Sequence, residues 1–296
     1  MIVIKLIGGL GNQMFQYALG FALKIKFKQN LFFEDSYYVL NSKPKEQFTV
    51  RKLEMDIFPN LHFQLAPKLL KDVIHGRSRI LLKLRKESGR YFEINQVENE
   101  FVKIPDLVPL SLNVFSGYFQ CEEYFRFIKR ELKVHFTFPE LDNKNKVFEK
   151  KIIESNAVSV HIRRGDYVSI DHALRYHGIL PLSYYYDAID LLKKTYKDLT
   201  FFIFSDDLDW AKKNLKFSDE IHYFISGNVD SDSWKDMALM AKAKHHIVAN
   251  SSFSWWGAWL ADFSGTTIAP SNWFNPEFAN FRIEDFVPDS WIVIQM

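Results

Sequence analysis

Short apolar runs of strand length alternate with segments of helical periodicity through the second half of the chain. The predicted strands are residues 158–161, 200–204, 221–224, 246–249 and 266–269, and the helical segments are 183–196, 208–215, 234–243 and 253–261. Such alternation favours a parallel sheet, because each helix returns the chain to the starting edge of the sheet. The first half opens in the same way, with an apolar run at 2–7, a glycine turn and a helical run at 13–27. The chain is therefore predicted to have an α/β fold.

The length of the chain and a polar run near its middle predict two domains. The chain has 296 residues, which suits two domains of ordinary size. Pro139 and the polar residues 142–146 interrupt the apolar pattern and are interpreted as a linker. We expect an N-terminal domain at residues 1–140 and a C-terminal domain at residues 147–296. Both are predicted to be Rossmann-like and to face each other across a cleft.

Charge and cysteine content exclude several classes of protein. The 38 basic and 36 acidic residues give a net charge of +2, so nucleic-acid binding is not expected and any anionic ligand must meet local charge. The single Cys121 excludes an internal disulfide and a cysteine metal cluster, and it favours a reducing compartment. The sequence shows neither an 18-residue apolar run nor a secretory leader. We expect a cytoplasmic protein without a transmembrane segment.

Residues 68–86 combine basic and apolar positions in a pattern that predicts one amphipathic helix. Its lysine and arginine side chains are expected to form a solvated face. Contact with a membrane surface or with an acidic partner is the alternative interpretation. Peripheral contact with a membrane therefore stays open.

The segment His161-Ile162-Arg163-Arg164-Gly165-Asp166-Tyr167 leads out of a predicted buried strand. Two guanidinium groups at a strand end suit a diphosphate, because the planar fork of arginine matches phosphate oxygens two at a time. A surface Arg–Asp pair that closes a turn explains the same residues equally well on local evidence.

A second polar cluster, residues 250–254, precedes an apolar helical run. The free N–H groups of a first helical turn, together with serine hydroxyls, can bind a phosphate. An ordinary N-cap at Ser252 or Ser254 is the alternative. Phosphate binding needs a cation as well as a helix N-terminus, so Arg163 and Arg164 favour the phosphate interpretation.

Two acidic clusters and the first glycine turn are candidate cofactor sites. Ser205-Asp206-Asp207 could hold a divalent cation or accept hydrogen bonds from a nucleobase or ribose, and residues 230–232 imitate a D-x-D pattern. The metal interpretation is the weaker one for both clusters. The glycine turn departs from the dinucleotide fingerprint, because Met14 stands where its third glycine would fall. A nicotinamide cofactor is disfavoured, and the turn instead presents Asn12 and Gln13.

Four blocks of the sequence together resemble bacterial alpha-1,2-fucosyltransferases. They are GGLGNQMFQYA (8–18), HIRRGDY (161–167), FSDD (204–207) and DMALMAKAKHHIVANSSFSWWGAWL (236–260). The resemblance implies a GT-B-type fold with the acceptor on the N-terminal and the donor on the C-terminal domain. It also implies metal-independent, inverting transfer of L-fucose from GDP-β-L-fucose to the 2-hydroxyl of a terminal galactose in an oligosaccharide. No cofactor is expected, since GDP-fucose is a substrate, and O-antigen or lipopolysaccharide biosynthesis is the implied setting.

The resemblance also suggests roles for individual residues. The candidate catalytic residues are Arg163, Asp166, His161 and Asn12. The candidate donor-binding residues are Arg164, Gly11, Gln13, Ser205, Asp206, Asp207, Asn250, Ser251, Ser252 and Phe253. No metal ligand is assigned. Asp166 and His161 are the nearest candidates for the general base, but either could instead hold an arginine in place.

Two other functions remain as alternatives. One is a transferase of another GDP-sugar or another fucosyl linkage. The other is a non-catalytic glycan-binding protein, which would have no reason to concentrate Arg163, Arg164, Asp166 and Ser252 at strand ends. The sequence does not identify the acceptor glycan.

Overall fold

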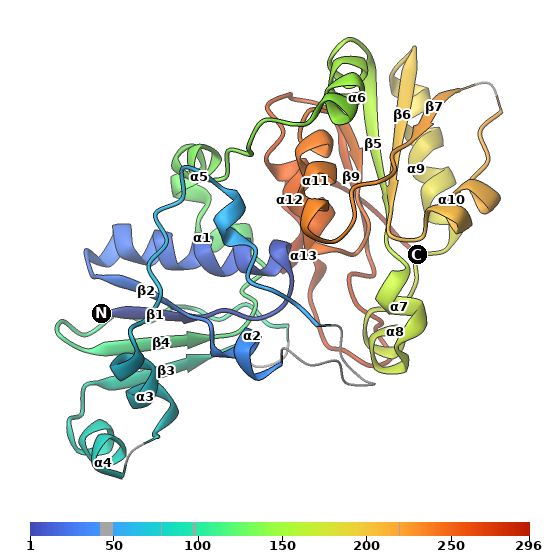
Figure 1. Ribbon diagram of the computed structural model, residues 1–296. Coiled ribbons are helices and arrows are strands. Elements are labelled where there is room, and N and C mark those ends of the chain that lie inside the picture. Colours follow the sequence, from blue (N-terminus) through green and yellow to red (C-terminus); the bar gives the residue numbers. More distant parts are fainter. Residues whose placement is uncertain (42–49, 78, 97–98, 219) are drawn as a thin grey trace. The chain divides into compact units, whose positions relative to one another are not determined.

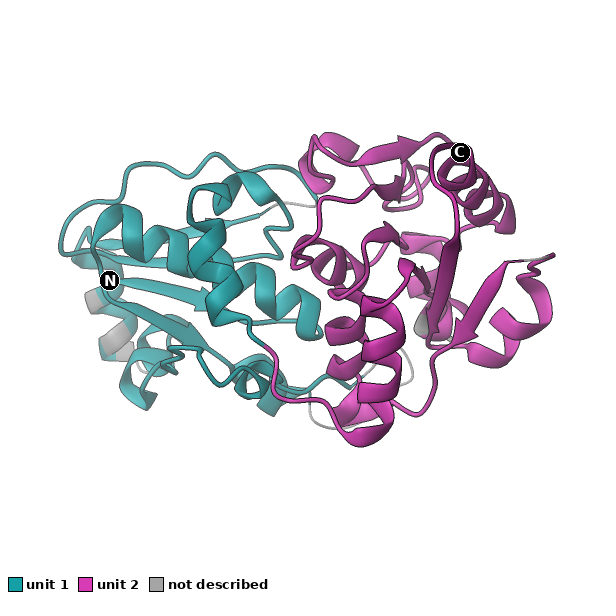
Figure 2. Cartoon of the chain, turned by 90° about the horizontal axis from the view of Figure 1, so that it is seen from above, with its two compact units in different colours: residues 1–45, 50–137 teal, residues 46–49, 138–296 magenta. Residues whose placement is uncertain are grey.

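The computed structural model describes residues 1–41, 50–77, 79–96, 99–218 and 220–296. Two compact units divide the described residues between Thr137 and Phe138 (Figure 2). The predicted linker at 142–146 is wrong: Asp142 caps helix α6 (Asn143–Ile153), and its carboxylate accepts a hydrogen bond from the backbone N–H of Asn145 at 3.0 Å. A polar run that contains a good N-cap residue begins a helix as readily as it forms a linker.

The first unit contains a four-stranded parallel sheet with the order β2-β1-β4-β3 (Figure 1). Its strands are β1 (Ile2–Lys5), β2 (Leu31–Glu34), β3 (Tyr91–Asn95) and β4 (Leu112–Ser116). Helix α1 (Leu10–Phe27) joins β1 to β2, as the glycine turn and helical run predicted. Strand β3 was not predicted, because it lies at the sheet edge, where Phe92 and Glu93 are exposed and the alternation of apolar residues is weak.

Several shorter helices complete the first unit. They are α2 (Ser36–Leu40), α3 (Lys68–His75), α4 (Arg79–Glu87) and α5 (Lys129–His135), with 3-10 turns η1 (Met55–Ile57), η2 (Glu122–Tyr124) and η3 (Arg126–Ile128). The single helix predicted over 68–86 is wrong, because α3 ends at His75. Gly76 follows in the left-handed conformation with φ of +61°, which ends a helix without the strain that a side chain would add.

The second unit contains a six-stranded parallel sheet with the order β10-β9-β8-β5-β6-β7. Its strands are β5 (Asn156–Ile162), β6 (Leu199–Ser205), β7 (Ile221–Phe224), β8 (His245–Ile247), β9 (Thr267–Pro270) and β10 (Ile292–Ile294). Its further helices are α7 (Gly165–Ser169), α8 (Asp171–His177), α9 (Leu182–Thr195), α10 (Leu208–Asn214), α11 (Trp234–Met240), α12 (Ser252–Trp259) and α13 (Ile283–Phe286), with the 3-10 turn η4 (Asp230–Asp232). The α/β class and the two parallel-sheet units are confirmed.

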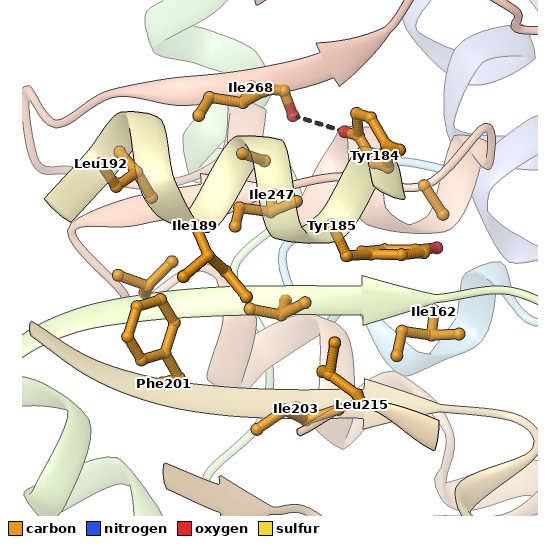
Figure 3. Packing of buried hydrophobic residues seen from close by; sticks show 14 of the residues in the cluster. Ile162, Tyr184, Tyr185, Ile189, Leu192, Phe201, Ile203, Leu215, Ile247 and Ile268 are labelled. Carbon is orange, nitrogen blue, oxygen red and sulfur yellow. Dashed lines mark hydrogen bonds between the residues drawn. The ribbon is translucent and has the colours of Figure 1, made fainter. Parts of the chain in front are cut away.

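Both faces of the second sheet are covered, which explains why its strands read as continuous apolar runs. On one face, Val160 and Phe201 pack against α9, and Figure 3 shows Ile189 and Leu192 of that helix over the sheet. On the other face, Phe202 packs against Leu239 of α11. Tyr184 of α9 is also buried, and its hydroxyl donates to the backbone carbonyl oxygens of Val248 at 2.6 Å and Ile268 at 3.2 Å.

Two histidines, His245 and His246, lie within β8 and have structural contacts. His245 Nδ1 accepts a hydrogen bond from the backbone N–H of Thr266 at 3.0 Å. His246 Nδ1 lies 2.8 Å from Ser159 Oγ on the neighbouring strand β5. Burial, and to a lesser extent the proximity of His245, lower the pKa of His246 to about 3, so the imidazole is neutral in the folded protein.

This burial makes the stability of the protein depend on pH. Below the ordinary histidine pKa of about 6.5, the unfolded chain gains a proton that the folded chain does not, so the free energy of unfolding falls. When the pH falls from 7 to 5, the protonation of His246 in the unfolded chain should lower the free energy of unfolding by about 2 kcal/mol. Urea unfolding of wild type and His246→Gln at both pH values measures this decrease. The decrease should be about 2 kcal/mol smaller in the variant than in wild type. An equal decrease in wild type and variant would show that His246 also takes up the proton in the folded protein.

Among the described residues, no helix is both long and apolar enough to cross a membrane.

Candidate active site

The carboxyl end of β5 lies at the point where the strand order of the second unit reverses. Strands β6 and β7 lie on one side of β5, and β8, β9 and β10 lie on the other. In open α/β sheets, ligands bind at the carboxyl ends of the strands next to such a reversal. The residues that follow β5, β6 and β8 are those that the sequence singled out, and this unit brings them to one edge.

Arg163 is held in place by a carboxylate from the neighbouring strand end. Its Nη1 lies 2.9 Å from Asp206 Oδ2, and the two side chains remain 21% and 24% exposed. Asp206 Oδ1 also accepts a hydrogen bond from the backbone N–H of Arg164 at 2.8 Å. The guanidinium is therefore oriented and still within reach of solvent. Recognition of guanosine by Asp206 stays a prediction, and its carboxylate already has two partners.

Arg164 has a different environment from Arg163. Its Cζ lies 3.8 Å from the centre of the Trp210 ring, and its Nε lies 3.4 Å from Asp207 Oδ2. Asp207 in turn caps α10 by accepting the backbone N–H of Trp210 at 3.2 Å, and its own N–H donates to Ser205 Oγ at 3.0 Å. Arg164 is therefore in an Arg–Asp pair, but its partner comes from the end of β6, 43 positions along the chain, and not from the same turn. Trp210 was not predicted, since nothing in its sequence position marks it as a partner of an arginine.

Gly165 allows helix α7 to begin directly against Asp206. A Cβ atom at this position would lie 2.6 Å from Asp206 Oδ2, too close for any side chain without displacing the carboxylate. Asp166 follows in α7, and its side chain lies outside the described part of the structure. Its assignment as a catalytic residue stays a prediction.

Tyr167 connects the end of β5 to the loop that precedes α12. Its ring lies 5.5 Å from Arg163 Cζ and stacks on His177 with a centroid distance of 4.4 Å. Its buried hydroxyl donates to the backbone carbonyl oxygen of Asn250 at 3.1 Å. This residue was missed as a site residue, although it closes the same sequence block as the two arginines.

The N-terminus of α12 follows β8. Ser251 is the N-cap, and its Oγ accepts the backbone N–H of Phe253 at 3.3 Å. The alternative caps Ser252 and Ser254 are wrong: Ser254 instead accepts the backbone N–H of Ala249 at 3.2 Å. Ser252 and Phe253 are only partly buried. They can therefore present a hydroxyl and amide groups to an anion.

Asn250 is nearly inaccessible to solvent, at 2% exposure. Its Nδ2 donates to the backbone carbonyl oxygen of His177 at 2.9 Å. Its Oδ1 has no hydrogen-bond partner among the described residues. A buried acceptor without a partner is costly, so this amide is a candidate for contact with a bound substrate or a water molecule.

His161 lies on the face of the sheet that α12 covers. The side chain is 5% exposed, and its ring centre lies 5.8 Å from that of Phe253. Its Nδ1 has no hydrogen-bond partner within the described ranges. Burial, and to a lesser extent the charge of Arg163, together lower the pKa of His161 to about 3. The imidazole is therefore neutral and a weak proton acceptor.

The candidates from the first unit are less accessible than predicted. Gln13 is fully buried, and its amide donates to the carbonyl oxygens of Gly8 at 3.1 Å and Lys52 at 2.8 Å and accepts the N–H of Glu54 at 2.9 Å. Gln13 therefore anchors residues 52–54 and does not present its side chain to a ligand. Gly11 is buried in the first turn of α1. Asn12 is partly buried, and its Oδ1 accepts a hydrogen bond from Gln120 Nε2 at 2.7 Å.

In the part of the chain that the structure describes, no three or more His, Cys, Asp or Glu side chains are grouped as a metal site. In the D-x-D segment, Asp232 pairs with Lys235 at 2.9 Å.

The edge of the second sheet thus combines an oriented arginine, a helix N-terminus and a buried unpaired amide oxygen, which together can bind a phosphorylated donor. The model of glycosyl transferase family 11 matches residues 1–295. The chain belongs to this family. This confirms the resemblance seen in the four sequence blocks, and the protein is a glycosyltransferase.

Curated relatives cover nearly the whole chain. The alpha-1,2-colitosyltransferase of Escherichia coli is 39% identical, over 99% of this chain and 99% of its own. The O-antigen biosynthesis glycosyltransferase WbnK of Escherichia coli is 32% identical, over 96% of this chain and 97% of its own. The galactoside alpha-(1,2)-fucosyltransferase 2 of Rattus norvegicus is 25% identical, over 98% of this chain and 74% of its own.

Proposed function

We propose that the protein transfers L-fucose from GDP-β-L-fucose to the 2-hydroxyl of a terminal galactose in an oligosaccharide, with inversion and without a metal. The observation that supports this best is the Arg163–Asp206 pair at 2.9 Å, which orients a guanidinium beside the loop that begins α12. The α-1,2 linkage is supported by two relatives, which are named as an alpha-1,2-colitosyltransferase and a galactoside alpha-(1,2)-fucosyltransferase. The setting of O-antigen biosynthesis follows from the name of another relative.

The proposed step is a single displacement. A bond forms between the acceptor oxygen and C1 of the sugar while the bond from C1 to the β-phosphate oxygen breaks, and the electron pair of that bond leaves with GDP. Arg163 and the first amides of α12 stabilise the charge that develops on the diphosphate. Both are in place before the reaction, so the stabilisation requires little reorganisation.

The acceptor hydroxyl must lose its proton to a base within hydrogen-bond reach. His161 is a poor candidate, because burial and the charge of Arg163 lower its pKa to about 3 and make the imidazole a weak base. Asp166 therefore stays the principal candidate among the predicted residues. Asn12 is proposed as an acceptor-side residue, in keeping with an acceptor role for the first unit and a donor role for the second.

Transfer of colitose is the second candidate, because the colitosyltransferase shares 39% identity with this chain over its full length. Colitose is L-fucose without the 3-hydroxyl group. A site that binds the diphosphate would treat the two donors alike, so contacts to the sugar ring must decide between them. Loss of a hydrogen bond to one hydroxyl can change discrimination by several orders of magnitude when the site is built for it.

Calorimetric titration with GDP, GDP-fucose and UDP, each in the presence of EDTA, tests the proposal. We expect saturable binding of the two guanine compounds and no binding of UDP. Binding of UDP with equal affinity, or no binding at all, would contradict the donor assignment. Turnover of GDP-fucose and GDP-colitose with lactose as the acceptor, followed by linkage analysis of the product, then distinguishes the two sugars and tests the 2-hydroxyl.

A further inference from the structure

Positive charge is concentrated in one short part of the first unit. Residues 68–90, here called the basic hairpin, contain eight basic and two acidic residues, a net charge of +6, whereas the whole chain carries +2. The rest of the chain therefore carries a net charge of −4. An anionic surface would attract this segment and repel the remainder, which favours a single orientation of approach.

Helix α3 of the basic hairpin rests on the sheet and leaves an apolar side chain exposed. Leu70 and Ile74 pack with Val3 of β1 and Val114 of β4. Leu69 lies next to them in sequence but is 68% exposed. Leu69 is therefore an apolar side chain that is open to solvent and is not part of the cluster formed by Leu70 and Ile74.

Helix α4 is tethered to the unit on one side. Arg85 Nη1 donates to the carbonyl oxygen of Ile74 at 2.8 Å, its Nη2 lies 3.2 Å from Glu93 Oε2, and its Cζ lies 3.8 Å from the centre of the Tyr91 ring. Leu82 packs against Gly76, where a Cβ would lie 3.1 Å from Leu82 Cδ1. These contacts fix which side of α4 faces the unit.

The other side of α4 faces solvent with both apolar and cationic groups. Ile80 is 72% exposed, and the Lys83 side chain is 73% exposed. The two residues are three positions apart and lie on the same face of the helix. Lys86 is also exposed. In Figure 1, α3 and α4 lie beside β3, which is the edge strand of the first sheet.

We propose that the basic hairpin binds the surface of a membrane that contains anionic lipids. Lysines that flank exposed aliphatic side chains on short amphipathic helices fit the boundary between headgroups and acyl chains. Each basic residue near such a surface strengthens binding by about fivefold. Single-stranded nucleic acid fits less well, because residues 68–90 contain no Phe, Tyr or Trp on which bases could stack.

Flotation with vesicles tests this inference independently of the transfer reaction. The probes are vesicles of phosphatidylcholine alone and vesicles with about one third phosphatidylglycerol, at low and high salt. We expect binding only to the anionic vesicles, weakened by salt. The double variant Lys83→Glu/Lys86→Glu should bind on the order of 30-fold more weakly, and Ile80→Ser should bind more weakly with an unchanged salt dependence.

A matched control makes the same charge change elsewhere. Lys212→Glu/Lys213→Glu alters two exposed lysines on α10 and should bind vesicles like wild type. All variants should retain the thermal stability and the GDP affinity of wild type. Equal binding to neutral vesicles, or wild-type binding by Lys83→Glu/Lys86→Glu, would overturn the proposal. Tighter binding to polyuridylate than to vesicles would assign the hairpin to nucleic acid instead.

Discussion

Arg163→Ala is expected to lower turnover by on the order of a hundredfold or more while the protein stays folded. The side chain is partly exposed and its partner Asp206 is also within reach of water, so its removal leaves no buried cavity and no fully buried charge. Turnover falls because the negative charge that develops on the leaving diphosphate would be stabilised by one hydrogen-bond donor fewer. Steady-state kinetics with GDP-fucose, together with a thermal unfolding curve, measures both parts of the expectation.

Two further variants sharpen this test. Arg163→Lys keeps the charge but not the planar fork, so it should recover only part of the activity. Arg282→Ala removes an arginine of the same unit whose side chain is 76% exposed and lies 3.9 Å from its nearest carboxylate, and it should behave like wild type. Near-normal turnover by Arg163→Ala would mean that the diphosphate is bound elsewhere.

The parallel sheet of the second unit could be predicted because local and long-range preferences agree there. Strand β6, for example, is buried along nearly its whole length, so an uninterrupted apolar run identifies it without knowledge of its neighbours. The positions of the site residues followed from the same logic. Parallel strands end at one edge, and polar residues that follow β5, β6 and β8 must gather there.

The features that could not be predicted from the sequence depend mainly on contacts between residues far apart in the chain. The Arg163–Asp206 pair joins residues 43 positions apart, and local evidence left an Arg–Asp turn equally plausible. Strand β3 exists because β4 provides its hydrogen bonds along five residue pairs, while its own side chains are half exposed. The N-cap of α12 was expected one or three residues too late, because three serines in this segment are equivalent by type and only the backbone decides among them.

Gln13 is a residue that a sequence block marked as a site residue, but the contacts expected for its side chain differ from those in the structure. Its position after a glycine turn suggested that it faces a ligand. The structure shows three hydrogen bonds from its amide to the backbone, two of which reach residues 52 and 54. No pattern near position 13 predicts contact with residues 52–54, because only the tertiary fold brings these residues next to Gln13.

The second large effect is expected from Asp206, which we propose as a positioning residue for Arg163. Asp206→Asn removes the negative charge that pairs with Arg163 Nη1, and it weakens the hydrogen bond that the backbone N–H of Arg164 donates to this side chain. A guanidinium displaced by about 1 Å can cost on the order of a hundredfold in rate. We expect a large fall in kcat, a small change in the affinity for GDP, and little change in thermal stability. Asp209→Asn, an exposed carboxylate on α10, should be neutral.

Gly165→Ala tests the same geometry without touching a charged group. Alanine favours a helix over glycine by about 1 kcal/mol, so the substitution should do no harm to α7 on propensity alone. Its Cβ would, however, lie 2.6 Å from Asp206 Oδ2, and the carboxylate must move and take Arg163 with it. We therefore expect a variant that is as stable as wild type and as impaired in kcat as Asp206→Asn, and the double variant should be no worse than either single one. Additive losses in the double variant would show that Gly165 and Asp206 act separately.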